Sequence, residues 1–181
     1  MINYPEGFDW IPIYKELADK LLQYKDRRAE LIEILKDIYD NFEGFENPFR
    51  EKKVDNEIHD TCPFTIFASF NKGQKDETRR NIIGEFKKKF DLKSSPPTSF
   101  SGIPNAMPLS MWFYSDYNKR KPTDIPTLWN LFEKGILYAD NPSEENKASF
   151  ETAFDTAAAS LCSATHAIPP WIIGYLIPNR S

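Results

Sequence analysis

The sequence predicts a single domain over residues 1–181 that is mainly α-helical, with about five or six helices. Apolar residues recur at three–four spacing in several separate segments, which is typical of helices that bury one face. Hydrophobic residues make up 40% of the chain, and aromatic residues alone make up 14%. Because large aromatic side chains bury much apolar area, this composition can fill a core of its own.

The N-terminal part predicts one long helix, or two nearly continuous helices, over about residues 12–42. Pro12 suits the first turn of a helix, where its missing N–H costs nothing. Apolar residues keep one face up to Leu22 and again from Leu31 to Phe42. Residues 43–60 are polar and irregular, and we expect them to form a surface loop.

The middle of the chain holds a short, very apolar run at residues 63–70, which fits a buried strand or a buried helical turn equally well. A short strand pair formed by residues 64–70 and 171–177 is therefore an open alternative. Asp76 or Thr78 is expected to cap the helix that follows. That helix carries its apolar face at Ile82, Ile83, Phe86 and Phe90.

Two further helices are predicted after a loop of serine, proline and glycine over residues 94–108. The first begins at residues 123–126 and ends at residues 140–142, where a proline follows. Ser143 is expected to cap the second helix. The inward face of the second helix is predicted at Phe150, Ala153, Phe154 and Ala157.

A locally basic segment lies within a chain whose net charge is −4. Residues 72–93 carry eight basic and four acidic side chains, and long cationic side chains on one helix can converge on the phosphates of DNA. The alternative is a solvated helix face that is neutralised by Asp76, Glu77 and Glu85. The candidate DNA-binding residues are Arg79, Arg80, Lys87, Lys88, Lys89 and Lys93, together with Lys119 and Arg120 from a nearby loop.

An aromatic run at residues 111–114 supplies a second candidate contact with nucleic acid. Trp112 and Tyr114 offer flat faces on which an extruded or single-stranded base can stack. Core packing is the competing interpretation, and the general burial of aromatic residues favours it.

The chain contains two cysteines and two histidines, His59, Cys62, Cys162 and His166, in the spacings H-x-x-C and C-x-x-x-H. Thiolate and imidazole in this combination suit tetrahedral zinc. The two pairs lie about a hundred residues apart, however, and structural zinc sites usually use compact ligand clusters. We therefore expect no metal or other cofactor, and interpret these residues as small buried or partly buried thiols and surface histidines.

No catalytic centre is predicted. The phosphate-binding pattern G-x-x-x-x-G-K-[ST] is absent from the sequence, and no nucleophile is accompanied by a base and an orienting group. The first ten residues hold two acids and no base, which excludes a signal peptide, and no apolar stretch is long enough to span a membrane. Two cysteines do not make a disulfide framework, so we expect a cytoplasmic protein. Because the catalytic patterns are missing, we also expect that it is not an enzyme.

Several motifs occur in an order that resembles a known family. They are W-I-P-I-Y-K-E-L-A-D-K-L-L at residues 10–22, P-F-T-I-F-A-S-F-N-K-G at residues 63–73, F-S-G-I-P at residues 100–104 followed by Trp112-Phe113, and D-I-P-T-L-W-N-L-F at residues 124–132. Together with Tyr138-Ala139 and residues 150–155, they resemble the N-terminal region of McrB-like AAA+ proteins, the GTPase subunits of modification-dependent restriction systems. The resemblance covers residues 10–155 and leaves residues 156–181 as a divergent tail.

The resemblance implies a non-catalytic domain that recognises target DNA for phage defence, with or without a base modification. It also implies two protein partners, the AAA+ GTPase motor and the nuclease subunit that the motor recruits. The alternative is a helical protein-interaction or scaffolding domain that does not bind DNA and whose basic helix is only solvated.

Overall fold

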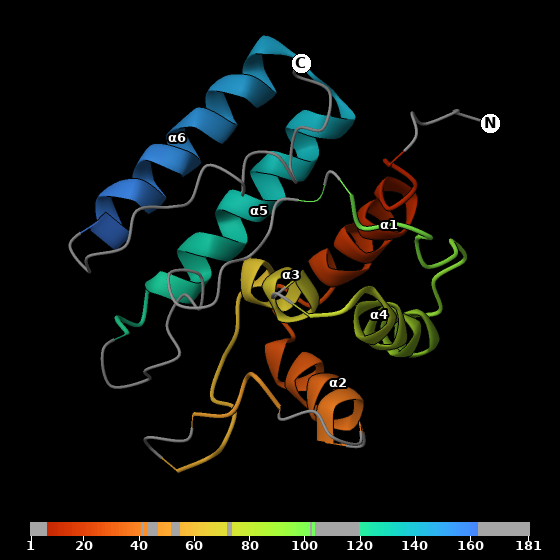
Figure 1. The fold of residues 1–181 in the computed structure, drawn as a ribbon. Coiled ribbons are helices and arrows are strands. Elements are labelled where there is room, and N and C mark those ends of the chain that lie inside the picture. Colours follow the sequence, from red (N-terminus) through yellow and green to blue (C-terminus); the bar gives the residue numbers. More distant parts are fainter. Residues whose placement is uncertain are drawn as a thin grey trace.

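Six α-helices make up the regular structure of those residues that the computed structural model describes (Figure 1). The described residues are 7–40, 42, 47–51, 55–71, 74–101, 103 and 120–162, and these ranges contain no strand. The mainly α-helical fold class is therefore confirmed. The helices are α1 (Ile11–Leu22), α2 (Arg28–Asp40), α3 (Pro63–Asn71), α4 (Asp76–Phe90), α5 (Asp124–Asp140) and α6 (Glu144–Cys162).

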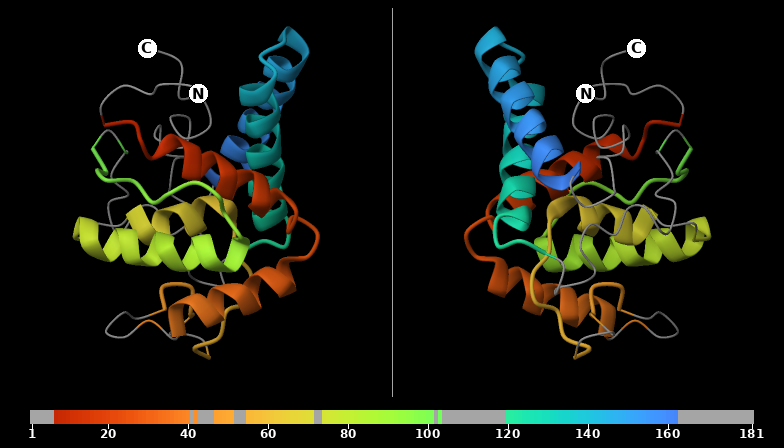
Figure 2. Two further views of the ribbon diagram at one scale, coloured as in Figure 1. Left: turned by 90° about the vertical axis from the view of Figure 1, so that its right-hand side faces the viewer. Right: turned by 90° about the vertical axis from the view of Figure 1, so that its left-hand side faces the viewer.

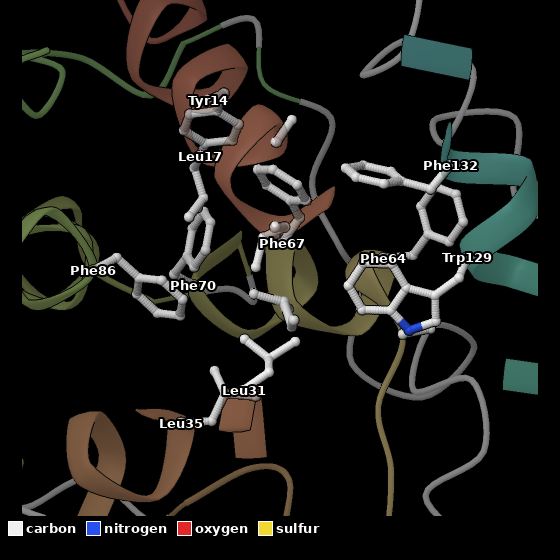
Figure 3. Packing of buried hydrophobic residues seen from close by; sticks show 14 of the residues in the cluster. Tyr14, Leu17, Leu31, Leu35, Phe64, Phe67, Phe70, Phe86, Trp129 and Phe132 are labelled. Atoms are coloured by element: carbon white, nitrogen blue, oxygen red, sulfur yellow. The ribbon is translucent and has the colours of Figure 1, made fainter. Parts of the chain in front are cut away.

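Helix α3 lies at the centre of the fold, and all nine of its residues are buried. Its aromatic side chains point towards three different helices (Figure 3). The ring centroid of Phe64 lies 5.7 Å from that of Phe132 in α5, and Phe70 lies 5.4 Å from Phe86 in α4. A helix that is apolar all round needs partners on every side. Of the two alternatives for this run, the helix is confirmed and a strand at residues 64–70 is wrong.

Helices α1 and α2 are two separate elements, divided by a turn at residues 23–27. Helix α4 lies between them on one side of α3 and crosses the front of the left-hand view in Figure 2. Leu31 and Leu35 of α2 point towards α3 in Figure 3, so the apolar faces predicted for the N-terminal part do meet the central helix.

Helices α5 and α6 form an antiparallel hairpin on the other side of α3 (Figures 1 and 2). The hydroxyl oxygen of Ser143 accepts a hydrogen bond from the backbone N–H of Asn146 at 3.2 Å, which confirms the predicted cap. Phe150, Ala153 and Ala157 of α6 are buried and Phe154 is partly buried, as the spacing predicted.

Two local expectations are wrong. The residue before α4 is Lys75, and it makes no side-chain capping hydrogen bond, so neither Asp76 nor Thr78 caps this helix as expected. The loop at residues 43–60 does not lie only at the surface, because Phe49, Glu51 and Ile58 are buried. Phe49 packs on the ring of Tyr39 with centroids 5.4 Å apart, so this loop contributes to the core.

The second strand of the alternative pair, at residues 171–177, lies outside the described residues. Within the described part, α6 runs beyond residue 155 and ends at Cys162. None of the described helices combines the length and the apolar character that crossing a membrane requires.

Candidate nucleic-acid interface

The charges of α4 follow its macrodipole. Asp76 and Glu77 occupy the first turn, near the positive end of the helix, and Lys87, Lys88 and Lys89 occupy the last turn, near the negative end. The helix ends at Asp91, whose backbone is left-handed with φ of 50°. The run of lysines therefore has a structural reason to be there in addition to any role in binding.

Arg79 points into the protein. Its side chain is 12% exposed, its guanidinium lies 4.0 Å from the centre of the Phe100 ring, and its Nε donates to the carbonyl of Phe70 at 3.1 Å. It also donates to Oδ1 of Asn71 at 2.6 Å, which additionally accepts a hydrogen bond from the Tyr14 hydroxyl. Arg79 thus satisfies the C-terminal end of α3, and it is not presented to a ligand.

Arg80 and Lys87 lean to one side of α4, towards the segment that follows the helix. Arg80 donates to the carbonyl of Thr98 at 3.2 Å, and Lys87 donates to the carbonyl of Lys93 at 2.9 Å and to that of Ser94. Neither side chain forms an ion pair with any described residue. Their hydrogen bonds fix them in place, and the charge of Lys87 also helps to lower the pKa of the Glu16 and Asp91 carboxyls.

The other three cations of this region are paired with carboxylates. Lys88 contacts Glu85 at 2.6 Å, Lys93 contacts Asp91 at 2.6 Å, and Lys89 contacts Asp37 of α2. Lys88 and Lys93 nevertheless remain 72% and 76% exposed, and exposed ion pairs of this kind are weak. The six cations of residues 79–93 therefore do not all share one face, because Arg79 points inward and Lys89 contacts α2.

Two acidic side chains far away in sequence hold the segment that follows α4. Glu16 of α1 accepts hydrogen bonds from the backbone N–H groups of Lys93 at 2.6 Å and Ser94 at 2.8 Å. Asp9 accepts hydrogen bonds from the backbone and the hydroxyl of Thr98, both at 2.7 Å. Sequence reasoning missed these contacts because 77 to 89 residues separate the partners and no local pattern marks them.

Of the candidate contact residues between residues 112 and 120, the structure describes only Arg120. Arg120 is 7% exposed and pairs in the interior with Glu51, which is 3% exposed. It also donates to the carbonyl of Asp60 at 3.2 Å, so it joins the loop before α3 to the start of α5. Lys119, Trp112 and Tyr114 lie outside the described residues, as does the rest of the aromatic run.

The two potential zinc ligands whose side chains are described, His59 and Cys62, do not form a common site. His59 hydrogen-bonds Asp55 at 3.0 Å, and Cys62 is fully buried with its sulfur 3.2 Å from the hydroxyl of Thr65. Burial raises the pKa of the Cys62 thiol to about 11, which keeps it protonated at neutral pH. The described residues contain no group of three or more potential metal ligands. The side chain of Cys162 and all of His166 lie outside the described residues.

Two buried tyrosine hydroxyls form hydrogen bonds with side chains of α3. Burial raises the pKa of the Tyr14 and Tyr39 hydroxyls well above the ordinary value, so both act as neutral hydrogen-bonding groups. Tyr39 is bonded to Ser69 and Tyr14 to Asn71, both in α3. These contacts fix the central helix.

A comparison with curated proteins and a comparison with solved structures each yielded no match. A protein family described as a domain of unknown function, DUF8425, matches residues 10–168. This match includes all six described helices, from Ile11 to Cys162, and it spans the whole of α4. Since most of the chain is matched, the chain belongs to the DUF8425 family.

Proposed function

We propose that the chain is a non-catalytic DNA-recognition domain of a McrB-type restriction GTPase, and that it contacts DNA phosphates through the exposed side of α4. The contact residues are Arg80, Lys87 and Lys88, with Lys93 at the end of the helix. In this role the domain acts in the cytoplasm beside an AAA+ GTPase motor and its nuclease subunit, and needs no cofactor.

The observation that supports the proposal is that two cations have no carboxylate partner among the described residues. Arg80 and Lys87 are held by main-chain carbonyls and form no ion pair among the described residues, so their charges remain available to a phosphate. Lys88, one residue further on, is 72% exposed, and its contact with Glu85 can be exchanged for a phosphate at little cost. The McrB-like motifs at residues 10–155 supply the restriction context.

A protein-interaction domain is the second candidate. It is favoured by the ion pairs of Lys88, Lys89 and Lys93, which reduce the charge that α4 offers to DNA. It is also favoured by Leu137 of α5, which is 46% exposed and is one of two large hydrophobic side chains exposed among the described residues. In this case α4 is a solvated helix, and the α5–α6 hairpin contacts the motor or the nuclease.

The test is duplex DNA binding measured by fluorescence anisotropy over a range of salt from about 50 to about 200 mM. We expect the substitutions Arg80→Gln, Lys87→Gln and Lys88→Gln together to reduce the slope of log affinity against log salt by roughly 2.7, because each lost phosphate contact contributes about 0.9. Glutamine retains a donor for the carbonyl contacts, so the fold should be kept.

A matched control removes three lysines from other helices, Lys36→Gln, Lys134→Gln and Lys147→Gln. The net charge changes equally, and we expect the salt slope to stay at its original value. Equal slopes for the two triple variants would contradict contact through α4. Absence of DNA binding by the original chain, with Leu137→Lys abolishing binding to the purified motor or nuclease subunit, would favour the second candidate.

A further inference from the structure

Gly84 lies in the middle of α4 at a position where the fold does not require a glycine. Apart from the backbone of its own helix and its two neighbours, no atom of the chain lies within 4 Å of the position that a Cβ would occupy. Gly7 has the left-handed backbone that favours glycine, with φ of 86°, but Gly84 does not. Because glycine in the interior of a helix is less favourable than alanine, this residue costs the domain stability without an internal reason.

Three of the four neighbours of Gly84 on the helix surface are cationic, and the fourth is the uncharged Asn81. Arg80 precedes it by four residues, and Lys87 and Lys88 follow it by three and four, the spacings at which side chains share a helix face. Arg80 and Lys87 bend towards the carbonyls of residues 93–98, whereas Lys88 contacts Glu85. Open space therefore lies beside Gly84, which is itself partly buried, with cations on either side of it.

We infer that Gly84 is the point of closest approach where the phosphate backbone of a nucleic acid crosses α4. A missing side chain lets a ligand approach the helix backbone closely. The positive charges of Arg80, Lys87 and Lys88 select an anionic ligand, and a chain of phosphates can contact cations before and after the glycine at once. This inference rests on the proposed function and assigns the position at which that contact is tightest.

The experiment introduces uncharged side chains of increasing size at this position with the variants Gly84→Ala and Gly84→Leu. Both residues favour helices, so both variants should be at least as stable as the original chain, with the melting temperature of Gly84→Ala raised by roughly 2–4 °C. Binding of duplex DNA at fixed salt should weaken in order of size, with a loss of roughly tenfold for leucine. Ala148→Leu, on the exposed side of α6, is the control and should leave the DNA affinity unchanged.

Three results would overturn the inference. The first is equal DNA affinity for the original chain and Gly84→Leu while the triple glutamine variant of α4 still loses its salt slope, which would leave the proposed function intact. The second is a lower melting temperature for Gly84→Ala, which would show that the fold needs the glycine. The third is weaker binding of Gly84→Leu to a protein partner with unchanged binding to DNA. A chain that does not bind DNA at all would overturn the proposed function together with the inference.

Discussion

The guanidinium of Arg120 and the carboxylate of Glu51 form an ion pair in the interior of the domain, 69 residues apart in sequence. Their side chains are 7% and 3% exposed. The pair fastens the loop that precedes α3 to the start of α5, and Arg120 also donates to the carbonyl of Asp60. A residue that the sequence suggests for DNA contact thus has a structural partner instead.

Removal of Arg120 should therefore destabilise the domain strongly. Arg120→Ala leaves the Glu51 carboxylate buried without its charge partner, and we expect the free energy of unfolding in urea to fall by about 3–5 kcal/mol. The double variant Glu51→Leu with Arg120→Met should recover most of this loss. Arg27→Ala, which breaks an exposed pair with Glu30, is the control and should cost less than about 1 kcal/mol. A loss for Arg120→Ala as small as that of the control would show that the pair is not structural.

Substitution of Arg79 should affect stability and not the salt dependence of DNA binding. Arg79→Ala removes the side-chain donor to the carbonyl of Phe70 and one of the two donors to Oδ1 of Asn71, which we expect to cost about 2–3 kcal/mol. Arg79→Lys should not restore this, because an ammonium group cannot reproduce the planar set of donors. Urea unfolding measures the loss, and anisotropy on the folded fraction measures the slope. A reduced slope would place Arg79 at the DNA after all.

The segment that follows α4 should loosen in acid. Burial alone would raise the pKa of Asp9 and Glu16, but hydrogen bonds from Thr98 and from the backbone of residues 93–94 outweigh it and lower both values. A lowered pKa in the folded chain stabilises the fold fully above the ordinary values of 3.8 and 4.5, and this contribution is lost as the pH falls through the lowered values.

The variant that tests this is Glu16→Gln with Asp9→Asn, which removes both titrations. We expect the original chain to lose more unfolding free energy than the double variant when the pH is lowered from about 5 to about 3. Thermal unfolding followed by circular dichroism gives both values. Parallel pH profiles for the two proteins would show that these carboxylates do not hold the segment.

The thiol of Cys62 should be unreactive in the folded protein. It is fully buried, and burial raises its pKa to about 11, so little thiolate forms even at pH values near 8. In a Cys162→Ser background, we expect a thiol reagent to modify no cysteine in buffer and one cysteine in denaturant. Rapid modification of the folded chain would contradict the buried position.

Five of the six helices could be predicted from periodicity, because each buries one face and leaves charged residues on the other. Helix α3 could not be assigned in this way, since all nine of its residues are buried, the polar Thr65, Ser69 and Asn71 included. A run that is buried on every side has no exposed polar face to mark its period, so a strand and a helix look alike in the sequence.

The candidate interface could be predicted only as a list of cations on one helix. Whether each cation is free depends on partners that the sequence does not place nearby, such as Asp37 for Lys89 and Glu51 for Arg120. The same is true of Glu16, which acts on residues 93–94 from another helix. Local charge patterns therefore found the segment, but the three-dimensional fold decided which of its side chains are available.

The burial of α3 on every side also restricts the order in which the chain can fold on the ribosome. The phenylalanines of α3 leave the ribosome before the α5 residues that cover Phe64 have been synthesised. Until α5 arrives, the most apolar segment of the domain remains exposed to water and to other nascent chains. The place of the most apolar helix, third in the sequence and at the centre of the fold, thus delays its burial during synthesis until α5 has been made.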